Sequence, residues 1–452
     1  MLQARAGDIF VVSDNLAFDR DQVCEHRSLP GQVPILFCNA AYGGTLAAMR
    51  SLGRAGVPLI TVDPSMLAPG RYSRFSALHL SCPPFEMTGA LVEWLLRLGR
   101  SGPRRVLYAT SDAVSFALAR HRDELQPYFH LYQPDLDAIM GILDKGALLQ
   151  HARNAGFDTP ETWLPQSAED AARIARDVGD TLLIKPRSQL AVRNYSKGVV
   201  IEAGAGDVHA AYDGMMRLGA HDGNFAKQYP AAMLPMLQRY HSEGAQIVFS
   251  LSGFRDVTGR LVSMRGTHKV LQRPRRLGVG LCFEEAKIPP ELAESAVRLC
   301  ESIGYYGIFE IEFILSAGRA LLIDFNGRFY NQIAFDIARG MDLPAIAYAA
   351  ATGNTQELER LVSDAATRTE TGEIVYCDRF GLAVTIFAQR AFGTMSPDEA
   401  NHWRQWRKAH RGKIVDSVYD AADPLPAFVA VARQVLNAVR HPRSFVRQTG
   451  LA

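Results

Sequence analysis

The segment 307–326, GIFEIEFILSAGRALLIDFN, contains two strand-like runs joined by the tight turn SAGR. Side chains of a β-strand alternate between its two faces. Glu310 and Glu312 therefore share one face of the first run, and Asp324 and Asn326 share one face of the second. The opposite faces are apolar: Phe309, Ile311 and Phe313 in the first run, and Leu321, Ile323 and Phe325 in the second. The pattern predicts a hairpin with one buried face and one strongly acidic face.

An acidic face of this density needs a compensating cation. Carboxylates that lie close together repel unless a cation lies between them. Hard oxygen ligands suit Mg²⁺, which proteins often hold through one or two carboxylates together with substrate phosphates. The alternative is a hairpin whose polar face is simply hydrated. Two acid-ended strands joined by four residues favour the metal site.

Ahead of this hairpin, strand and helix signals alternate. Strand-like runs at 34–39 and 58–63 flank a helical pattern, and a third run at 105–112 leads into another helix. This order predicts a parallel, doubly wound sheet, whose ligands bind at the carboxyl ends of the strands. Gly43, Gly44 and Asp112 are expected at such ends and are candidate substrate contacts. The turn NAAYGG lacks a full G-x-G-x-x-G, which argues against an NAD-dependent oxidoreductase.

Basic residues in the middle of the chain are candidates for binding phosphate. Lys185 ends the strand-like run 180–186, which is expected to pair with 198–204, and Lys145 begins a helix predicted at about 144–154. The loop after Lys185 adds three further cations: Arg187, Arg193 and Lys197. A lysine at a strand end is commonly just solvated, and Lys145 alone is uninformative.

A second basic stretch, 264–280, lies between two strands and includes Lys269, Arg273 and Arg276. It is either a solvated loop or a lid that brings positive charge to a phosphate or carboxylate. The strand-like run 234–240 before it is a candidate interdomain hinge. Residues 355–372 read as a polar linker, and the last 80 residues are helix-biased without recognisable chemistry.

Composition limits the class of protein. The 452 residues suggest about three domains. Lys and Arg number 49 against 47 Asp and Glu, a net charge of +2, which gives no basic excess for a nucleic-acid partner. The sequence shows no run of apolar residues long enough to cross a membrane and no secretory signal. Its six cysteines are scattered. A cytoplasmic protein is therefore expected. The oligomeric state is left open, with a dimer among the expectations.

Taken in order, these motifs resemble the ATP-grasp superfamily. The resemblance rests on Lys145 in DKGALLQ, Lys185 in LLIKP, the hinge LQRY, Glu312 in EIEF, and the segment LLIDFNGR at 321–328, and it covers about residues 34–353. The stretch GRLVSMRGTHKVLQRP and the DPLP at 423–426 look like the carboxylate–amine ligase subgroup, which includes D-aspartate ligases.

The resemblance implies an α/β fold, α+β in its ATP-grasp part. Residues 1–125 would form an N-terminal preATP-grasp domain. The first ATP-grasp lobe would span 126–232, the second lobe with the metal site 233–355, and a helix-rich extension 373–452.

The resemblance also implies roles for single residues. Lys145 and Lys185 would touch ATP phosphates, and Arg328 would face the transferring phosphate. The remaining implied contacts are the adenine hinge, Gln238, Arg239 and Tyr240, and the Mg²⁺ ligands, Glu312, Asp324 and Asn326, with Mn²⁺ as an alternative metal. Lys269 is expected to border the same cleft and to take part in catalysis, with Arg273 and Arg276 as candidate substrate contacts.

Three positions depart from the family pattern. Asp324 stands where Glu is more frequent, the loop after Lys185 lacks several glycines, and Arg239 replaces an acid that is common in the hinge.

The implied activity is ATP-dependent joining of a small-molecule carboxylate to an amine through an acyl phosphate, with release of ADP and phosphate. The absence of a nucleophile motif such as G-x-S-x-G agrees with this. A carboxylase that uses bicarbonate and a non-catalytic nucleotide-binding protein remain as alternatives.

Overall fold

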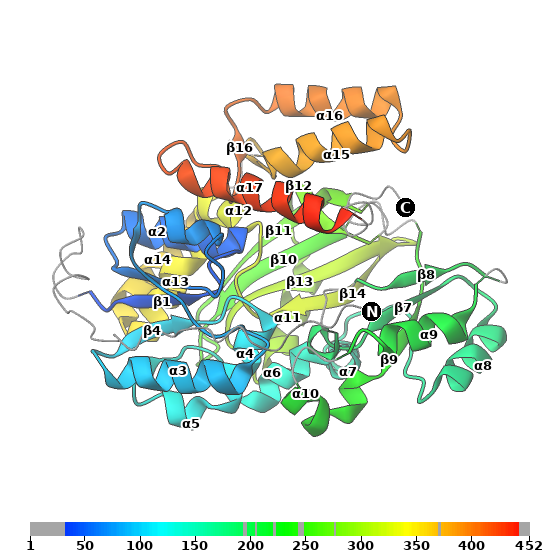
Figure 1. Ribbon diagram of the computed structural model, residues 1–452, viewed down its shortest axis with the longest axis horizontal. Helices are drawn as coiled ribbons and strands as arrows, with labels where there is room; N and C mark the ends of the chain where they lie inside the picture. Colours follow the sequence, from blue (N-terminus) through cyan, green and yellow to red (C-terminus); the bar gives the residue numbers. More distant parts are fainter. Residues whose placement is uncertain are drawn as a thin grey trace.

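A computed structural model describes residues 32–192, 197–203, 206–219, 223–242, 248–274, 277–368 and 372–442. It contains three β-sheets, of five, four and seven strands (Figure 1). The five-stranded sheet belongs to the N-terminal part, and the other two form the two lobes that the motifs predict. No helix among the described residues is long and apolar enough to cross a membrane.

The N-terminal domain is a parallel sheet with helices on both faces, as expected from the alternating signals. Its strand order is β3-β2-β1-β4-β5. The elements are β1 (Ile35–Cys38), α2 (Gly43–Arg54), β2 (Leu59–Val62), η1 (Pro69–Tyr72), β3 (Ser76–Leu80), α3 (Thr88–Arg100), β4 (Arg105–Tyr108), α4 (Asp112–Arg120), α5 (Arg122–Leu125) and β5 (Phe129–His130). Helix α2 packs on one face of the sheet, and α3 and α4 pack on the other. Strand β3 lies in a region for which the sequence suggested no strand.

The first lobe carries the four-stranded sheet, in the order β6-β9-β7-β8. Its elements are α6 (Leu136–Leu143), α7 (Lys145–Asn154), β6 (Thr162–Trp163), α8 (Ala168–Val178), β7 (Leu182–Pro186), η2 (Gln189–Ala191), β8 (Val199–Ile201), α9 (Val208–Met216), α10 (Gly223–Gln228), η3 (Pro230–Met233) and β9 (Pro235–Arg239). Strand β9 lies between β6 and β7, so the boundary predicted after residue 232 is one strand too early. The antiparallel pairing of β7 with β8 is confirmed.

The second lobe is built on the seven-stranded sheet, in the order β14-β13-β10-β11-β12-β15-β16. Its elements are β10 (Val248–Arg255), β11 (Val262–Arg273), β12 (Val279–Ala286), α11 (Pro290–Ile303), β13 (Gly307–Ser316), β14 (Arg319–Asn326), α12 (Ile333–Ala338), α13 (Leu343–Thr352) and α14 (Thr355–Thr367). The prediction of a polar linker over 355–372 is wrong for most of that range. Helix α14 occupies it and buries Leu358, Val362 and Ala365 at helical spacing.

The hairpin of β13 and β14 forms as predicted, with one exception in its register. Glu312 lies opposite Asp324 and Glu310 opposite Asn326, but the ladder shifts by one residue next to Glu312. The shift places Leu322 rather than Ile323 in the core with Phe325. The alternation assumed for 321–325 is therefore wrong, since a one-residue shift moves side chains to the other face.

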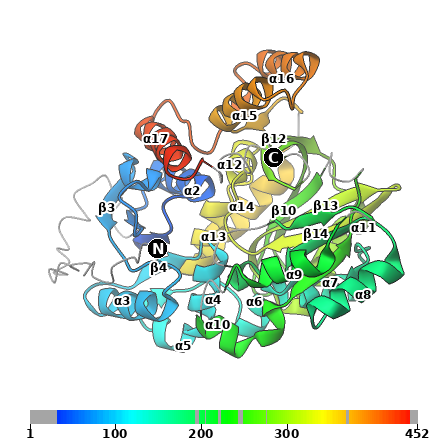
Figure 2. The same ribbon diagram turned by 45° about the vertical axis from the view of Figure 1, so that its right-hand side comes forward.

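The C-terminal segment is joined to two of the other units. Strands β15 (Val375–Cys377) and β16 (Ile414–Val415) complete the seven-stranded sheet, with α15 (Arg379–Ala391) and α16 (Pro397–Ala409) between them. Helix α17 (Leu425–Arg440) lies beside the N-terminal domain (Figures 1 and 2). Just before it, the buried Asp423 pairs with Arg50 of α2 at 2.9 Å. This segment is therefore integrated into the fold. The sequence predicted only a helix-rich extension over 373–452.

Candidate active site

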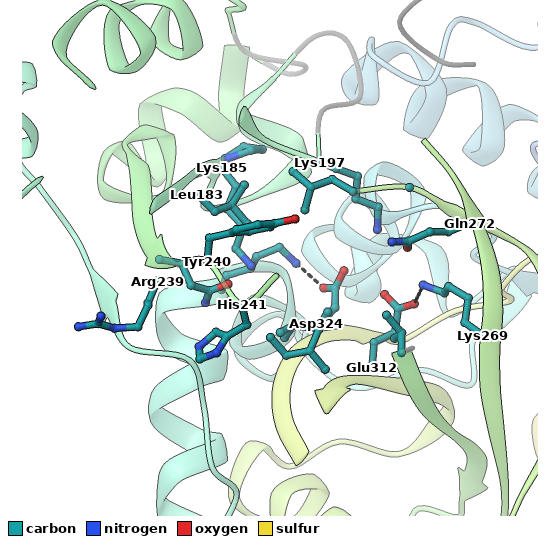
Figure 3. Close-up of a pocket in the computed structure, with 18 of the residues that line it drawn as sticks. Leu183, Lys185, Lys197, Arg239, Tyr240, His241, Lys269, Gln272, Glu312 and Asp324 are labelled. Atoms are coloured by element: carbon teal, nitrogen blue, oxygen red, sulfur yellow. Dashed lines mark hydrogen bonds and ion pairs between the residues drawn. The ribbon is translucent and has the colours of Figure 1, made fainter. Parts of the chain in front are cut away.

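A cleft lies between the four-stranded and seven-stranded sheets and contains most of the predicted nucleotide and metal residues (Figure 3). It encloses about 800 Å³, including space open to solvent. One group of lining residues is charged: Lys145, Lys185, Lys197, Lys269, Glu312 and Asp324. Another group is apolar or aromatic: Leu183, Tyr240, Val248, Ile314 and Ile323. A cleft with charged and apolar portions suits a ligand that carries both phosphates and an uncharged ring.

Two ion pairs, one buried and one part-buried, join the acidic residues to lysines from other elements. Lys269 of β11 donates to Glu312 at 2.5 Å, and Lys145 of α7 donates to Asp324. Burial raises the pKa of both carboxyls, but the lysines outweigh it and hold both pKa values below their ordinary range. Glu312 and Asp324 are therefore anionic at neutral pH.

The donor set fits a magnesium ion that is bound together with phosphates. Within the ranges described, no group of three or more His, Cys, Asp or Glu side chains is arranged to hold a metal. Glu312 and Asp324 face each other across the hairpin and supply two hard oxygen donors. A Mg²⁺ ion at this pair would need further oxygens, which is how proteins commonly bind Mg²⁺ with substrate phosphates.

Lys185 is the second-last residue of the buried strand β7 and points into the cleft (Figure 3). Burial, followed by the neighbouring Lys145 ammonium, lowers the pKa of Lys185 to about 7. Asp324 and Glu312 act in the opposite direction, and Lys197 adds to the lowering. A buried lysine with a depressed pKa indicates a site that would gain from an added anion.

The two lysines are brought together by a local network. Asp144 caps α7 by accepting a hydrogen bond from the amide of Gly146 at 2.9 Å. The guanidinium of Arg187, two residues after Lys185, pairs with the same carboxylate, at 2.7 Å between Nη2 and Oδ2. The amide of Lys145 also donates to the carbonyl of Arg187 at 2.9 Å. Arg187 thus ties the start of α7 to the end of β7.

The predicted hinge residues differ in orientation. Gln238 is buried and donates to the hydroxyl of Thr162 at 3.0 Å. Tyr240 extends its ring into the cleft, whereas the guanidinium of Arg239 points away from it (Figure 3). Arg239 pairs instead with Glu161 at 2.8 Å and with Asp180. This outward pairing keeps the charge of Arg239 away from the cleft.

A chain of hydrogen bonds continues from the acidic face toward the N-terminal domain. Asn326 donates to Glu310 at 3.0 Å, and its amide oxygen accepts from Arg328 at 3.2 Å. Arg328 also pairs with Asp112 at 2.5 Å. Burial, and then the charge of Glu312, raise the pKa of Glu310. The role of Asn326 as a metal ligand stays a prediction, since its oxygen here faces Arg328.

The remaining predicted residues lie elsewhere. Gly43 and Gly44 begin α2 and contact Ser417 and Tyr330, and a side chain on Gly44 would collide with the Tyr330 carbonyl. Arg273 donates to the carbonyl of Gly381 at 3.5 Å. These three, like Asp112, Asn326 and Arg328, are not among the described residues that line the cleft. Arg193 and Arg276 lie outside the described residues.

Several lining residues carried no usable signal in the sequence. Leu183, Val248 and Ile314 appear there as ordinary strand residues, and Gln272 and His241 as unremarkable polar ones. Ile323 could be assigned to the cleft only by knowing the register shift in the hairpin. Lys197 was noticed as part of a basic loop, and it lines the cleft.

We expect Lys269→Met to destabilise the folded protein by about 3–5 kcal/mol, because removing one partner leaves Glu312 buried and unpaired. The loss should be largest at pH 7.5. It should shrink as the pH falls, since the unpaired Glu312, with its pKa raised by burial, can then take up a proton. Urea unfolding at pH 7.5 and at a lower, acidic pH measures this effect. Lys287→Met, at an exposed lysine, is the control, and an equal loss in both variants would contradict the interpretation.

Comparisons with known proteins agree with this architecture. No family model and no curated protein sequence matches the chain. Among solved structures, N5-carboxyaminoimidazole synthetase from Staphylococcus aureus, complexed with ADP, is 15% identical at a TM-score of 0.51, over 73% of this chain and 78% of that one.

Two further solved structures show the same likeness. A biotin carboxylase–β-γ-ATP complex from Campylobacter jejuni is 15% identical with a TM-score of 0.54, covering 71% of each chain. An L-amino acid ligase from Bacillus licheniformis is 10% identical with a TM-score of 0.52, over 71% of this chain and 74% of that one. At these identities the likeness concerns the fold. Together with the two-lobed architecture, it shows that this chain has the ATP-grasp fold.

Proposed function

We propose that the protein is an ATP-dependent ligase that joins a small-molecule carboxylate to an amine and releases ADP and phosphate. The observation that carries the proposal is the arrangement of Glu312 and Asp324. The two carboxylates face each other, each is neutralised by a lysine, and Lys185 lies beside them in a cleft with an apolar portion. This is the charge pattern that a magnesium–nucleotide complex requires.

The reaction needs positioning and charge more than a covalent protein nucleophile. A substrate carboxylate attacks the terminal phosphorus of ATP, and an acyl phosphate and ADP form. The amine then displaces phosphate to give the amide. Lys145 and Lys185 would orient the phosphates and, with Arg328, offset charge on the transferring group.

Magnesium would supply charge neutralisation and a fixed orientation of the phosphate oxygens. Glu312 and Asp324 would hold it, with Asn326 as the third predicted ligand. When the metal and the phosphates are bound, Lys145 and Lys269 are free to turn from the carboxylates toward phosphate oxygens. The apolar side chains, with Tyr240 and the backbone of β9, would enclose the adenine.

A bicarbonate-dependent carboxylase is the second candidate. The solved structures with this fold include a biotin carboxylase and a 2-oxoglutarate carboxylase domain whose complex contains MgADP and bicarbonate. Bicarbonate would take the place of the substrate carboxylate in the same first step. The two functions therefore differ in the acid that ATP consumption requires: bicarbonate for a carboxylase, and another carboxylic acid for the ligase.

Product analysis tests the proposal. Purified protein is incubated with MgATP and a panel of carboxylic acids, including amino acids, each with and without amines, with bicarbonate as a separate arm. We expect ADP and phosphate, and a hydroxamate when hydroxylamine replaces the amine. AMP with pyrophosphate, or hydroxamate formed without nucleotide, would contradict it. Dependence on bicarbonate alone would favour the carboxylase, and nucleotide binding without phosphate release throughout would favour a non-catalytic protein.

A further inference from the structure

The ion pair between Asp112 and Arg328 joins two parts of the chain that are 216 residues apart. Asp112 is the first residue of α4, which follows β4 at the carboxyl end of the N-terminal sheet. Arg328 lies two residues beyond β14, next to the acidic hairpin. The N-terminal domain therefore supplies a carboxylate to an arginine of the second lobe.

The guanidinium of Arg328 donates to Asp112, Asn326 and Phe329 among the described residues. Its Nε donates to Asp112 Oδ1 at 2.5 Å, its Nη2 to Asn326 Oδ1 at 3.2 Å, and its Nη1 to the carbonyl of Phe329 at 3.2 Å. Of these three bonds, the one to Asp112 joins two full charges and is therefore the strongest. A planar guanidinium held at three nitrogens has a defined direction.

The local structure also fixes Asp112. Ser111 caps α4 by accepting from the amide of Val114, and a carboxylate in the first turn of a helix is favoured by the helix dipole. The rigid end of a helix thus holds the carboxylate, which in turn can hold the longer and more flexible arginine side chain.

We propose that Asp112 is a positioning residue, which orients Arg328 toward the phosphoryl group that is transferred from ATP. The inference rests on the proposed function, because it assigns Arg328 to the transferring phosphate. Asp112 itself touches neither nucleotide nor metal in this account. Its substitution should leave nucleotide binding intact and weaken only the interactions that Arg328 makes during transfer.

The ion pair contributes little to stability. Both side chains are 22% exposed, and ion pairs that reach solvent typically contribute little to stability. Asp112→Asn should therefore fold normally, which thermal unfolding would verify. The Arg54–Asp420 pair offers a matched control, because the Asp420 side chain is 23% exposed and joins an arginine remote from the cleft. Asp420→Asn removes a comparable charge without touching Arg328.

The experiment uses MgADP alone and MgADP with aluminium fluoride, which mimics the transferring phosphoryl group and needs no acid or amine. For Asp112→Asn we expect unchanged MgADP affinity but binding of the trapped complex weakened roughly 10- to 100-fold, by analogy with the loss when a residue that orients a metal ligand is removed. Asp112→Glu, which keeps the charge, should recover part of the loss. Asp420→Asn should behave as wild type.

A double substitution separates positioning from direct contact. In the background of Arg328→Gln, Asp112→Asn should cause no further loss, because Asp112 acts only through Arg328. Additional weakening in that background, or wild-type trapping by Asp112→Asn, would overturn the inference while the proposed function stands. Wild-type protein that binds no MgADP would overturn both.

Discussion

Asp324→Asn is expected to reduce the maximal rate of ATP turnover by roughly 100-fold or more, even at saturating Mg²⁺. The substitution keeps the shape of the side chain but removes one of the two anionic donors that face each other in the hairpin. It also leaves Lys145 without its carboxylate partner in the free protein. Of the two carboxylates that would hold the metal, Glu312 alone would then remain.

Steady-state phosphate release at increasing Mg²⁺ measures this effect. Asp158→Asn is the matched control, because Asp158 is exposed, pairs loosely with Arg319 at 3.6 Å, and lies near the same strand. It should keep wild-type turnover. Near-normal turnover of Asp324→Asn at saturating Mg²⁺ would refute the assignment of the metal site.

Lys185→Met should weaken ATP binding roughly 10- to 100-fold, since a hydrogen bond to a charged group contributes about 1.5–3 kcal/mol. The depressed pKa of Lys185, about 7, adds a second expected signature. Above pH 7 the free protein holds Lys185 largely neutral. Bound phosphates raise the pKa of Lys185 again. The protein should therefore bind about one proton for each nucleotide bound at pH 8, and much less than one at pH 6.

Calorimetry at pH 8 in buffers of different ionisation enthalpy measures both the affinity and the proton uptake. ATP is almost fully deprotonated at this pH, so proton uptake reports on the protein. Lys227→Met, at an exposed lysine of α10, is the control and should change neither quantity. If Lys185→Met kept both the affinity and the proton uptake of wild type, Lys185 would not be a phosphate ligand.

The acidic hairpin shows which structural features the local sequence pattern can predict and which it cannot. Period-two alternation correctly predicted that the face carrying Glu310 and Glu312 meets the face carrying Asp324 and Asn326, because strand geometry depends only on neighbouring residues. It failed at Ile323. There Leu321 bridges to Asp158, and the amide of Leu322 donates to the Asp158 carbonyl, so a contact with a distant segment accompanies the register shift.

The lysines show where resemblance was needed. Spacing along the chain placed Lys145 at the start of a helix and Lys185 at the end of a strand. It could not show that Lys145 would reach Asp324, 179 residues away. The order of the motifs, matched to the ATP-grasp superfamily, assigned both residues to one nucleotide site but did not predict their ion pair.

Gly43 and Gly44 show the opposite case. The position of these glycines at a strand end suggested a ligand, following the general rule for parallel sheets. In the structure, Tyr330 and Ser417 pack against this turn, from segments whose proximity no local pattern reveals. Gly44 has instead a packing reason for its lack of a side chain, which is the close approach of the Tyr330 carbonyl.

A crystal structure with MgADP tests the central claim most directly. The account predicts the adenine between the two sheets, near Leu183 and Tyr240, the phosphates at Lys145 and Lys185, and the metal bound to Glu312 and Asp324. A nucleotide bound instead at the carboxyl edge of the N-terminal sheet, with the ion pairs of Glu312 and Asp324 intact, would contradict it.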